Sequence, residues 1–195
     1  TNDGKEIALR LLDPNPRQSG EEARANTSPG PLDFGQASVM AFLPNGDFLI
    51  GDGYQNGRIS RYNAEGELVS EFGSVGDGPG QFDLIHGIAV DRDRRIYVAD
   101  RNNNRIQVLT EDGEFIEEWP DVTDPVGIFI DENDAVWVVS AAVNRILRYN
   151  RDGVLQYHWG AGMGFGGGFP GGLGRPHQMD VDQDGNVYIA SWDGG

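Results

Sequence analysis

Short runs of apolar residues alternate with polar turns along most of the chain. Three successive runs read GIAVD, RRIYVAD and NRIQVL within residues 87–109, and they are rich in Val, Ile, Tyr and Leu. Runs of this length, with β-branched and aromatic side chains, predict β-strands rather than helices. Asn-Gly or Asp-Gly pairs stand at 45–46, 112–113, 152–153 and 184–185, where tight hairpins need a positive φ. The pattern predicts an all-β protein.

The same order of runs and turns recurs along the chain in four copies. Their starts are spaced by 48, 40 and 51 residues, at Ser38, His86, Val126 and His177. Four short antiparallel strands every ~40–45 residues are the signature of a β-propeller blade. We therefore predict a single partial β-propeller domain over residues 1–195. Its blades are expected at 34–73, 82–119 and 122–160, with an incomplete blade at 176–195.

Three further segments lie before or between these predicted blades. Residues 1–12 contain EIALRLL, which predicts the outer strand of a preceding blade. Residues 13–33 are rich in Pro, Asn, Ser and Glu and are expected to form a long loop. Residues 161–175 are rich in glycine and are expected to form a flexible connection between blades rather than a lid over a site.

Two histidines, His86 and His177, occupy the same position in alternate copies of the repeat. We call this first residue of each copy the axial position. Equivalent positions are related by the rotation that relates the blades, so both imidazoles should converge on the axis. Converging imidazoles are typical ligands of transition metals. The third histidine, His158, falls in the fourth strand of its copy and is not expected to be a ligand.

Other recurring polar residues are expected to be structural. Asp52 and Asp100 each end a second strand and should accept hydrogen bonds from backbone amides in neighbouring turns. Arg58, Arg105 and Arg145 recur at the start of the third strand, so they belong to the repeat and not to a site.

Composition narrows the classes of partner. The 31 acidic and 15 basic residues give a net charge of −16, which disfavours nucleic acid, because that partner requires phosphate contacts from Lys and Arg. No apolar run approaches the length of about 18 residues that a membrane span needs. The absence of cysteine excludes disulfides and thiolate metal ligands.

Four motifs carry a resemblance to known proteins. VADRNNNRIQVL (98–109) resembles the wall motif of NHL repeats. Together with it, DGYQNGR (52–58), PGQFDLIH (79–86) and Pro-His at 176–177 resemble the peptidyl-α-hydroxyglycine α-amidating lyase family. Members of that family are six-bladed propellers, so the resemblance implies an NHL-type β-propeller of six blades when complete.

The resemblance also implies an activity. In the family, three axial histidines hold a zinc ion, and His86 and His177 match two of them. Tyr54 stands where the family has its base, and Arg101 stands where an arginine serves the substrate carboxylate. The implied reaction eliminates glyoxylate from an α-hydroxyglycine to leave an amide, with zinc or another divalent transition metal as cofactor. The implied partner is a small peptide-like substrate, and the implied location is extracellular or periplasmic.

Two residues beside His177 depart from the family pattern. Gln178 replaces an aspartate that helps to hold a structural calcium in the family, which argues against calcium here. Arg175 places a positive charge beside the axial position. We expect both residues to line the substrate pocket.

The third ligand of the family is expected to lie outside this sequence. About three and a half blades of six are present, and the blade that residues 1–12 would complete is the one that carries the remaining histidine. A partial ring leaves two sheet edges open, so we expect further sequence or a second chain to close the propeller.

Alternatives remain for the function and for single residues. A non-catalytic NHL propeller that binds proteins would hold no metal, and a calcium-dependent lactonase-like hydrolase would need axial carboxylates in place of histidines. Tyr54 can be an ordinary aromatic at the top of a blade, and Arg101 can form an ion pair between blades. Axial residues can also simply face the water of the central channel.

Overall fold

All regular structure in the described part of the chain is β-strand. The computed structural model describes residues 10–11, 33–160, 174–182 and 184–191. The strands are β1 (Arg10–Leu11), β2 (Asp33–Phe34), β3 (Val39–Phe42), β4 (Phe48–Asp52), β5 (Arg58–Tyr62), β6 (Leu68–Phe72), β7 (Ser74–Val75), β8 (Gln81–Phe82), β9 (Ile85–Val90), β10 (Ile96–Asp100), β11 (Arg105–Leu109), β12 (Phe115–Trp119), β13 (Pro125–Ile130), β14 (Val136–Ser140), β15 (Arg145–Tyr149), β16 (Leu155–Trp159), β17 (Pro176–Val181) and β18 (Val187–Ser191). Within these residues no helix is long and apolar enough to cross a membrane.

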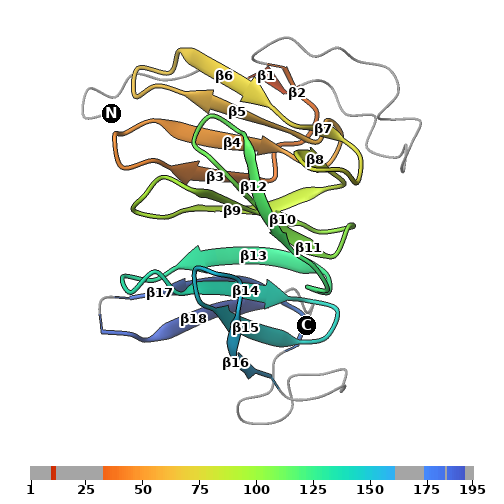
Figure 1. The fold of residues 1–195 in the computed structure, drawn as a ribbon, viewed down its shortest axis with the longest axis vertical. Helices are drawn as coiled ribbons and strands as arrows, with labels where there is room; N and C mark the ends of the chain where they lie inside the picture. The colour runs from red at the N-terminus through yellow and green to blue at the C-terminus, as the bar shows by residue number, and fades with distance from the viewer. Residues whose placement is uncertain (1–9, 12–32, 161–173, 183, 192–195) are drawn as a thin grey trace.

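The strands assemble into blades. Three four-stranded antiparallel sheets have the orders β3-β4-β5-β6, β9-β10-β11-β12 and β13-β14-β15-β16, and β17 pairs with β18. The inner strands β3, β9, β13 and β17 lie side by side in sequence order, so the sheets follow one another around a common axis (Figure 1). This arrangement confirms the predicted all-β propeller. The six-bladed ring remains a prediction.

The predicted boundaries can be compared only where the structure describes the chain. The strands of the three sheets fall within the predicted blades 34–73, 82–119 and 122–160. Of the predicted outer strand at 1–12, only residues 10–11 are described, and they pair in parallel with β2. The expected loop at 13–33 and the glycine-rich connection at 161–175 lie almost entirely outside the described residues.

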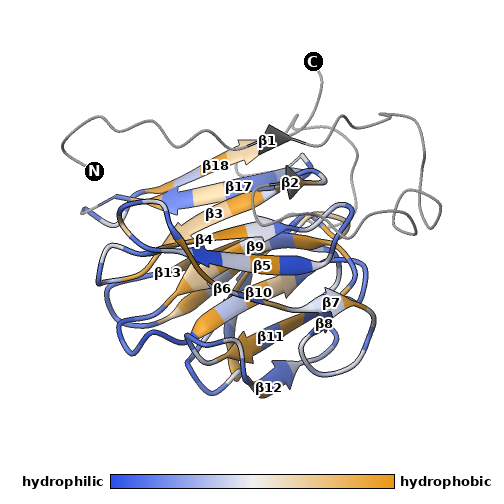
Figure 2. Ribbon diagram, turned by 90° about the horizontal axis from the view of Figure 1, so that it is seen from above, coloured by the Kyte–Doolittle hydropathy of each residue, from blue (hydrophilic) through white to orange (hydrophobic). Residues whose placement is uncertain are grey.

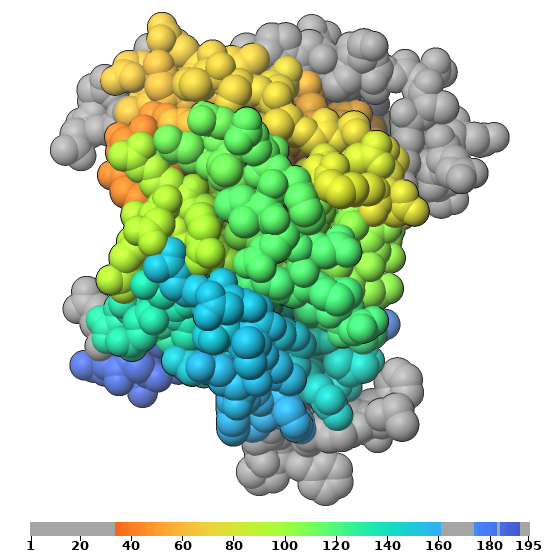
Figure 3. Space-filling model, viewed as in Figure 1, coloured from red at the N-terminus to blue at the C-terminus, as the bar shows by residue number. Residues whose placement is uncertain are grey.

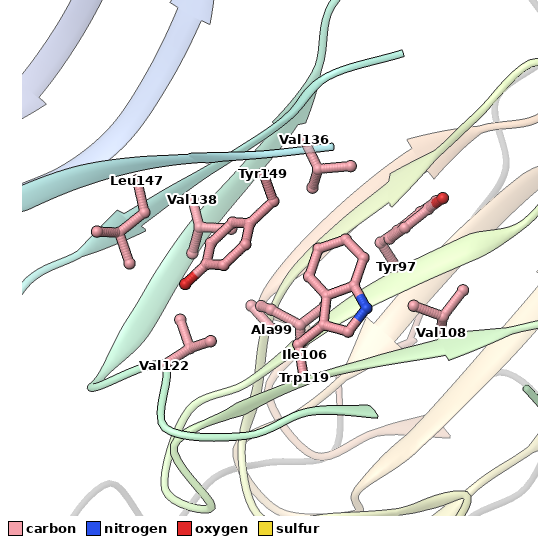
Figure 4. Packing of buried hydrophobic residues seen from close by; sticks show 10 residues of the cluster. All are labelled: Tyr97, Ala99, Ile106, Val108, Trp119, Val122, Val136, Val138, Leu147 and Tyr149. Carbon is pink, nitrogen blue, oxygen red and sulfur yellow. The ribbon is translucent and has the colours of Figure 1, made fainter. Parts of the chain in front are cut away.

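Apolar side chains pack between neighbouring blades. Strands carry most of the hydrophobic residues and the turns carry most of the polar ones (Figure 2). Between the second and third blades, Trp119 lies between Tyr97 and Tyr149, with ring centroids 5.6 and 5.3 Å away (Figure 4). Gly153, at a φ of 73°, lets the next turn cover this indole, because a Cβ there would lie 2.4 Å from its Nε1. The fourth strands β6, β12 and β16 lie on the face seen in Figure 3.

The residue two places before each axial position has a positive φ. The angles are 139°, 72°, 45° and 42° at Gln36, Leu84, Asp124 and Arg175. The carbonyl of Leu84 accepts a hydrogen bond from the amide of Arg101, and the carbonyl of Asp124 accepts one from Ala141. In the second and third blades, these bonds join the start of the inner strand to the turn after the second strand of the same blade.

The polar residues that recur at the ends of second strands are structural, as predicted. Asp52 Oδ1 accepts a hydrogen bond from the amide of Gly35 at 2.9 Å, and Asp100 Oδ1 accepts one from Asp83 at 2.8 Å. The same two carboxylates pair with Arg58 and Arg105, at 3.3 and 2.9 Å. Buried charges are tolerated when they are paired in this way.

A buried aspartate closes the turn between the first and second strands of the second blade. Asp91 Oδ1 accepts hydrogen bonds from the amides of Asp93 and Arg95, and its Oδ2 accepts from the Arg95 Nε and the Tyr97 hydroxyl. Burial by itself would raise the pKa of Asp91, but these bonds and the Arg95 charge lower it below its ordinary value. Equivalent bonds to an aromatic side chain are made by Asp131 and Asp182.

Acid should therefore remove the stabilisation that Asp91 provides. Because the folded-state pKa is depressed, the contribution is present above the ordinary value of 3.8 and is lost as the pH falls through the lower folded value. We expect Asp91→Asn to reduce the urea midpoint at pH 7 and to reduce it much less at pH 2. Asp112→Asn, with a side chain 79% exposed, is the control. A midpoint difference that is the same at both pH values would contradict the prediction.

Candidate functional site

The two axial histidines meet in the structure. His86 lies on β9 and His177 on β17, the inner strands of alternate blades, with β13 between them. Their ring centroids are 4.8 Å apart, and the ring planes are inclined by 73°. The repeat positions thus bring two imidazoles to one place, as the sequence predicts.

His86 is held in one tautomer by its neighbours. The ring is buried, with 3% exposed, and its Nδ1 lies 2.7 Å from the carbonyl oxygen of Val126 on β13. A carbonyl only accepts hydrogen bonds, so Nδ1 carries the proton and Nε2 keeps its lone pair. The Tyr54 hydroxyl, 3.1 Å from Nε2, donates to this lone pair. A histidine oriented by a backbone carbonyl in this way is pre-arranged as a metal ligand through its other nitrogen.

The electrostatics of the site favour neutral His86. Burial lowers the pKa of His86, and electrostatic repulsion from the neighbouring His177 and Arg101 lowers it further, while the bond to Val126 acts in the opposite direction. The neutral imidazole is the form that binds a metal.

Tyr54 reaches His86 because its turn lies directly against β9. The preceding residue, Gly53, has no room for a side chain, since a Cβ would lie 1.9 Å from the carbonyl oxygen of Ile85. The Tyr54 and His86 ring centroids are 5.9 Å apart, and Tyr54 is 38% exposed. The phenol is therefore both in contact with the imidazole and open to a ligand.

Arg101 makes the ion pair between blades that the sequence left as an alternative. Its Nε lies 2.6 Å from Asp124 Oδ1, at the start of the third blade. Its charge nevertheless contributes to the lowering of the His86 pKa. Within the described residues its two terminal nitrogens make no hydrogen bond, and 32% of the side chain is exposed.

Arg175 and Gln178 flank His177. The amide of Arg175 donates to Asn144 Oδ1 at 2.9 Å, and the residue is exposed. Gln178 is exposed on β17, and its Oε1 would lie 3.1 Å from a Cβ built on Gly127 of β13. Their expected place in the substrate pocket remains a prediction.

The donor set suits part of a zinc site. Two imidazoles, one with its Nε2 lone pair fixed, match the nitrogen ligands of catalytic zinc, which keeps an open position for substrate. Among the described residues no three His, Cys, Asp or Glu side chains form a group able to hold a metal ion. A third ligand from elsewhere therefore remains a prediction, and so does the argument from Gln178 against a structural calcium.

Two contributions to the site escape sequence analysis. One is the carbonyl of Val126, which orients His86, and the other is the carboxylate of Asp124, which binds Arg101. A backbone carbonyl leaves no trace in sequence. Asp124 carries one usable signal. It stands two residues before the axial residue Val126, as Arg175 stands two residues before the axial residue His177.

Comparisons with known proteins find similarity to NHL-repeat proteins and to amidating lyases. The NHL repeat family matches residues 82–109. NHL repeat-containing protein 3 of Homo sapiens is 34% identical over 103 residues, which cover 51% of this chain and 30% of that protein. Peptidyl-alpha-hydroxyglycine alpha-amidating lyase 1 of Drosophila melanogaster is 33% identical over 96 residues, which cover 44% of this chain and 18% of that protein.

The fold has solved counterparts. A streptogramin B lyase structure superposes with a TM-score of 0.62 at 18% identity, covering 80% of this chain and 48% of that one. The chain thus spans less than a third of the curated relatives described above and about half of this structure. Blades, repeat and motifs agree: the chain is a β-propeller that contains an NHL repeat at residues 82–109 and resembles NHL-repeat proteins and the amidating lyases.

Proposed function

We propose that the chain carries part of the active site of a metal-dependent lyase that cleaves the C–N bond of an α-hydroxyglycine-type substrate. One observation supports this most: the Tyr54 hydroxyl lies 3.1 Å from Nε2 of His86, beside His177. A candidate base and two candidate ligands thus lie side by side, as the motifs shared with amidating lyases lead us to expect. The proposal extends the similarity to these lyases, which covers only part of each relative.

Each residue has a role in this proposal. His86 and His177 would hold the zinc ion, which when bound polarises the substrate hydroxyl as a Lewis acid. Tyr54 accepts the proton of that hydroxyl. Arg101 binds the substrate carboxylate through its two terminal nitrogens, which bind no other described residue.

The bond changes balance without a further reactant. The O–H and C–N bonds of the substrate break, and the carbonyl group of glyoxylate forms. The electron pair of the C–N bond leaves with nitrogen, which takes a proton to give the amide. In this proposal Tyr54 enters the cycle as the phenolate, accepts the first proton and returns one to the leaving nitrogen, so it ends the cycle unchanged.

Replacing Tyr54 by phenylalanine tests the proposal. We expect Tyr54→Phe to reduce turnover of N-benzoyl-α-hydroxyglycine by about 100-fold, the usual scale for losing a general base, while the zinc content stays the same. Tyr157→Phe is the matched control, because that tyrosine is 56% exposed on the outer strand β16. Glyoxylate release and metal analysis give the two readouts.

Three outcomes separate the alternatives. Unchanged turnover in Tyr54→Phe would remove Tyr54 from the role of base. A wild-type protein that binds zinc but releases no glyoxylate would refute this substrate class. A wild-type protein with neither zinc nor turnover would favour the non-catalytic NHL scaffold.

A further inference from the structure

We propose that Asp124 is a positioning residue that aims Arg101 at the substrate carboxylate, so that the carboxylate is bound end-on by the two terminal guanidinium nitrogens. This inference rests on the proposed function, and it adds a residue and a binding geometry. Neither follows from the motifs, since Asp124 lies outside all of them.

The contact itself is specific. Arg101 Nε donates to Asp124 Oδ1 at 2.6 Å, with the two side chains 32% and 22% exposed. A guanidinium has one Nε–H and two terminal NH₂ groups. Because Asp124 occupies Nε, a ligand cannot bind side-on through Nε and one terminal nitrogen. The remaining fork, the two terminal nitrogens, matches a carboxylate bidentately. Asp124 therefore selects which edge of Arg101 a ligand meets.

Hydrogen bonds from their own backbone amides hold both Arg101 and Asp124 in place. The amide of Arg101 donates to the carbonyl of Leu84, two residues before His86. The amide of Asp124 donates to Asn104 Oδ1 at 2.9 Å. Asp124 lies two residues before Val126, whose carbonyl orients His86. The same few residues between the second and third blades thus hold both the arginine and the histidine.

The pair is not a requirement of the repeat. In the next blade, the residues at the same offsets are Ala141 in place of Arg101 and Arg175 in place of Asp124. Leu84 stands at the Asp124 offset one blade earlier. The fold therefore forms with aspartate, leucine or arginine at this position, and the ion pair is a feature of the junction beside His86. Structure alone does not demand it there, which favours a role in binding.

Two substitutions separate positioning from charge. Asp124 has a φ of 45°, a conformation that glycine and asparagine adopt readily, so neither substitution strains the backbone. Asp124→Gly removes the acceptor, whereas Asp124→Asn keeps an oxygen for Arg101 Nε and loses the charge. Asp121→Asn removes one charge from an exposed site in the same connection, also at a positive φ of 62°, and serves as the control.

We expect Asp124→Gly to raise KM for N-benzoyl-α-hydroxyglycine by roughly 10-fold with little change in kcat, because a substrate-binding contact is lost in ground and transition states alike. Binding of N-benzoylglycine should weaken equally, and binding of its neutral amide should not change. Asp124→Asn should restore most of the affinity. The control Asp121→Asn should behave as wild type.

The result that overturns the proposal is equally clear. If Asp124 only neutralises Arg101, both Gly and Asn variants will bind N-benzoylglycine more tightly than wild type. If Asp124 is only structural, the neutral amide will lose affinity as much as the acid, together with a lower Tm. A second measurement tests the Arg101–Asp124 contact independently of the proposed function. The ¹⁵N signal of the Arg101 Nε–H should be protected from exchange in wild type and in Asp124→Asn but not in Asp124→Gly. This result does not depend on whether turnover occurs.

Discussion

His86→Ala is expected to abolish stoichiometric zinc binding and to reduce lyase turnover by roughly 10³-fold or more, since a metal ligand is lost and not merely reoriented. The buried imidazole offers its Nε2 lone pair because Nδ1 is bonded to Val126, and alanine provides no donor. Loss of a residue that only hydrogen-bonds to a metal-binding side chain typically costs 10–100-fold in metal affinity. Loss of the metal-binding side chain itself should cost more. Zinc content after equilibrium dialysis and glyoxylate release measure the two effects.

The chain provides its own control. His158→Ala makes the same chemical change on the exposed outer strand β16 and should leave zinc and turnover as in wild type. His177 is only half-buried, and His177→Ala should reproduce the His86→Ala result. Loss of zinc in both variants could then not be explained by a folding defect at the buried His86 position. Stoichiometric zinc that survives both axial substitutions would contradict the proposed centre.

Trp119→Ala is expected to destabilise the protein by about 3–5 kcal/mol, the range for deleting a large buried aromatic side chain. The indole is 5% exposed and fills the space between the second and third blades, in contact with Tyr97 and Tyr149. Alanine would leave a cavity between blades that pack mainly through this layer. The free energy of unfolding from urea titration measures the loss.

Trp119→Phe separates packing from hydrogen bonding. Within the described residues the indole Nε1 is buried without a hydrogen-bond partner, so phenylalanine forfeits no bond while keeping most of the aromatic contact. We expect it to cost roughly 1–2 kcal/mol, less than alanine does, because phenylalanine leaves a smaller cavity. A loss below 1 kcal/mol for Trp119→Ala would show that the contact between these blades does not depend on the indole.

The repeat offsets predicted a good part of the structure. Because copies of a blade are related by rotation, equal offsets at His86 and His177 were enough to place the two rings together. The same reasoning assigned Asp52 and Asp100 to the ends of second strands, as acceptors of backbone amides from neighbouring turns, and both make such bonds. These are properties of the repeat, and a sequence pattern reports them directly.

The sequence was less informative about contacts between different offsets. Arg101 and Asp124 come from neighbouring blades and from unequal positions in the repeat, so no periodicity relates them. The proximity of Tyr54 to His86 followed from the family motif and not from spacing. Its physical cause is Gly53, whose missing side chain lets the turn touch the backbone of Ile85.

One imidazole joins three successive blades. The ring of His86 belongs to the second blade, accepts a bond from Tyr54 of the first, and donates one to Val126 of the third. Its tautomer is therefore defined only after all three blades have docked, and a chain with a loosened junction would present a ring free to exchange its proton between nitrogens. The proposed zinc ion would then be a ligand of the assembled state only: added metal should raise the melting temperature, and chelation should loosen the junctions around this ring before the outer strands.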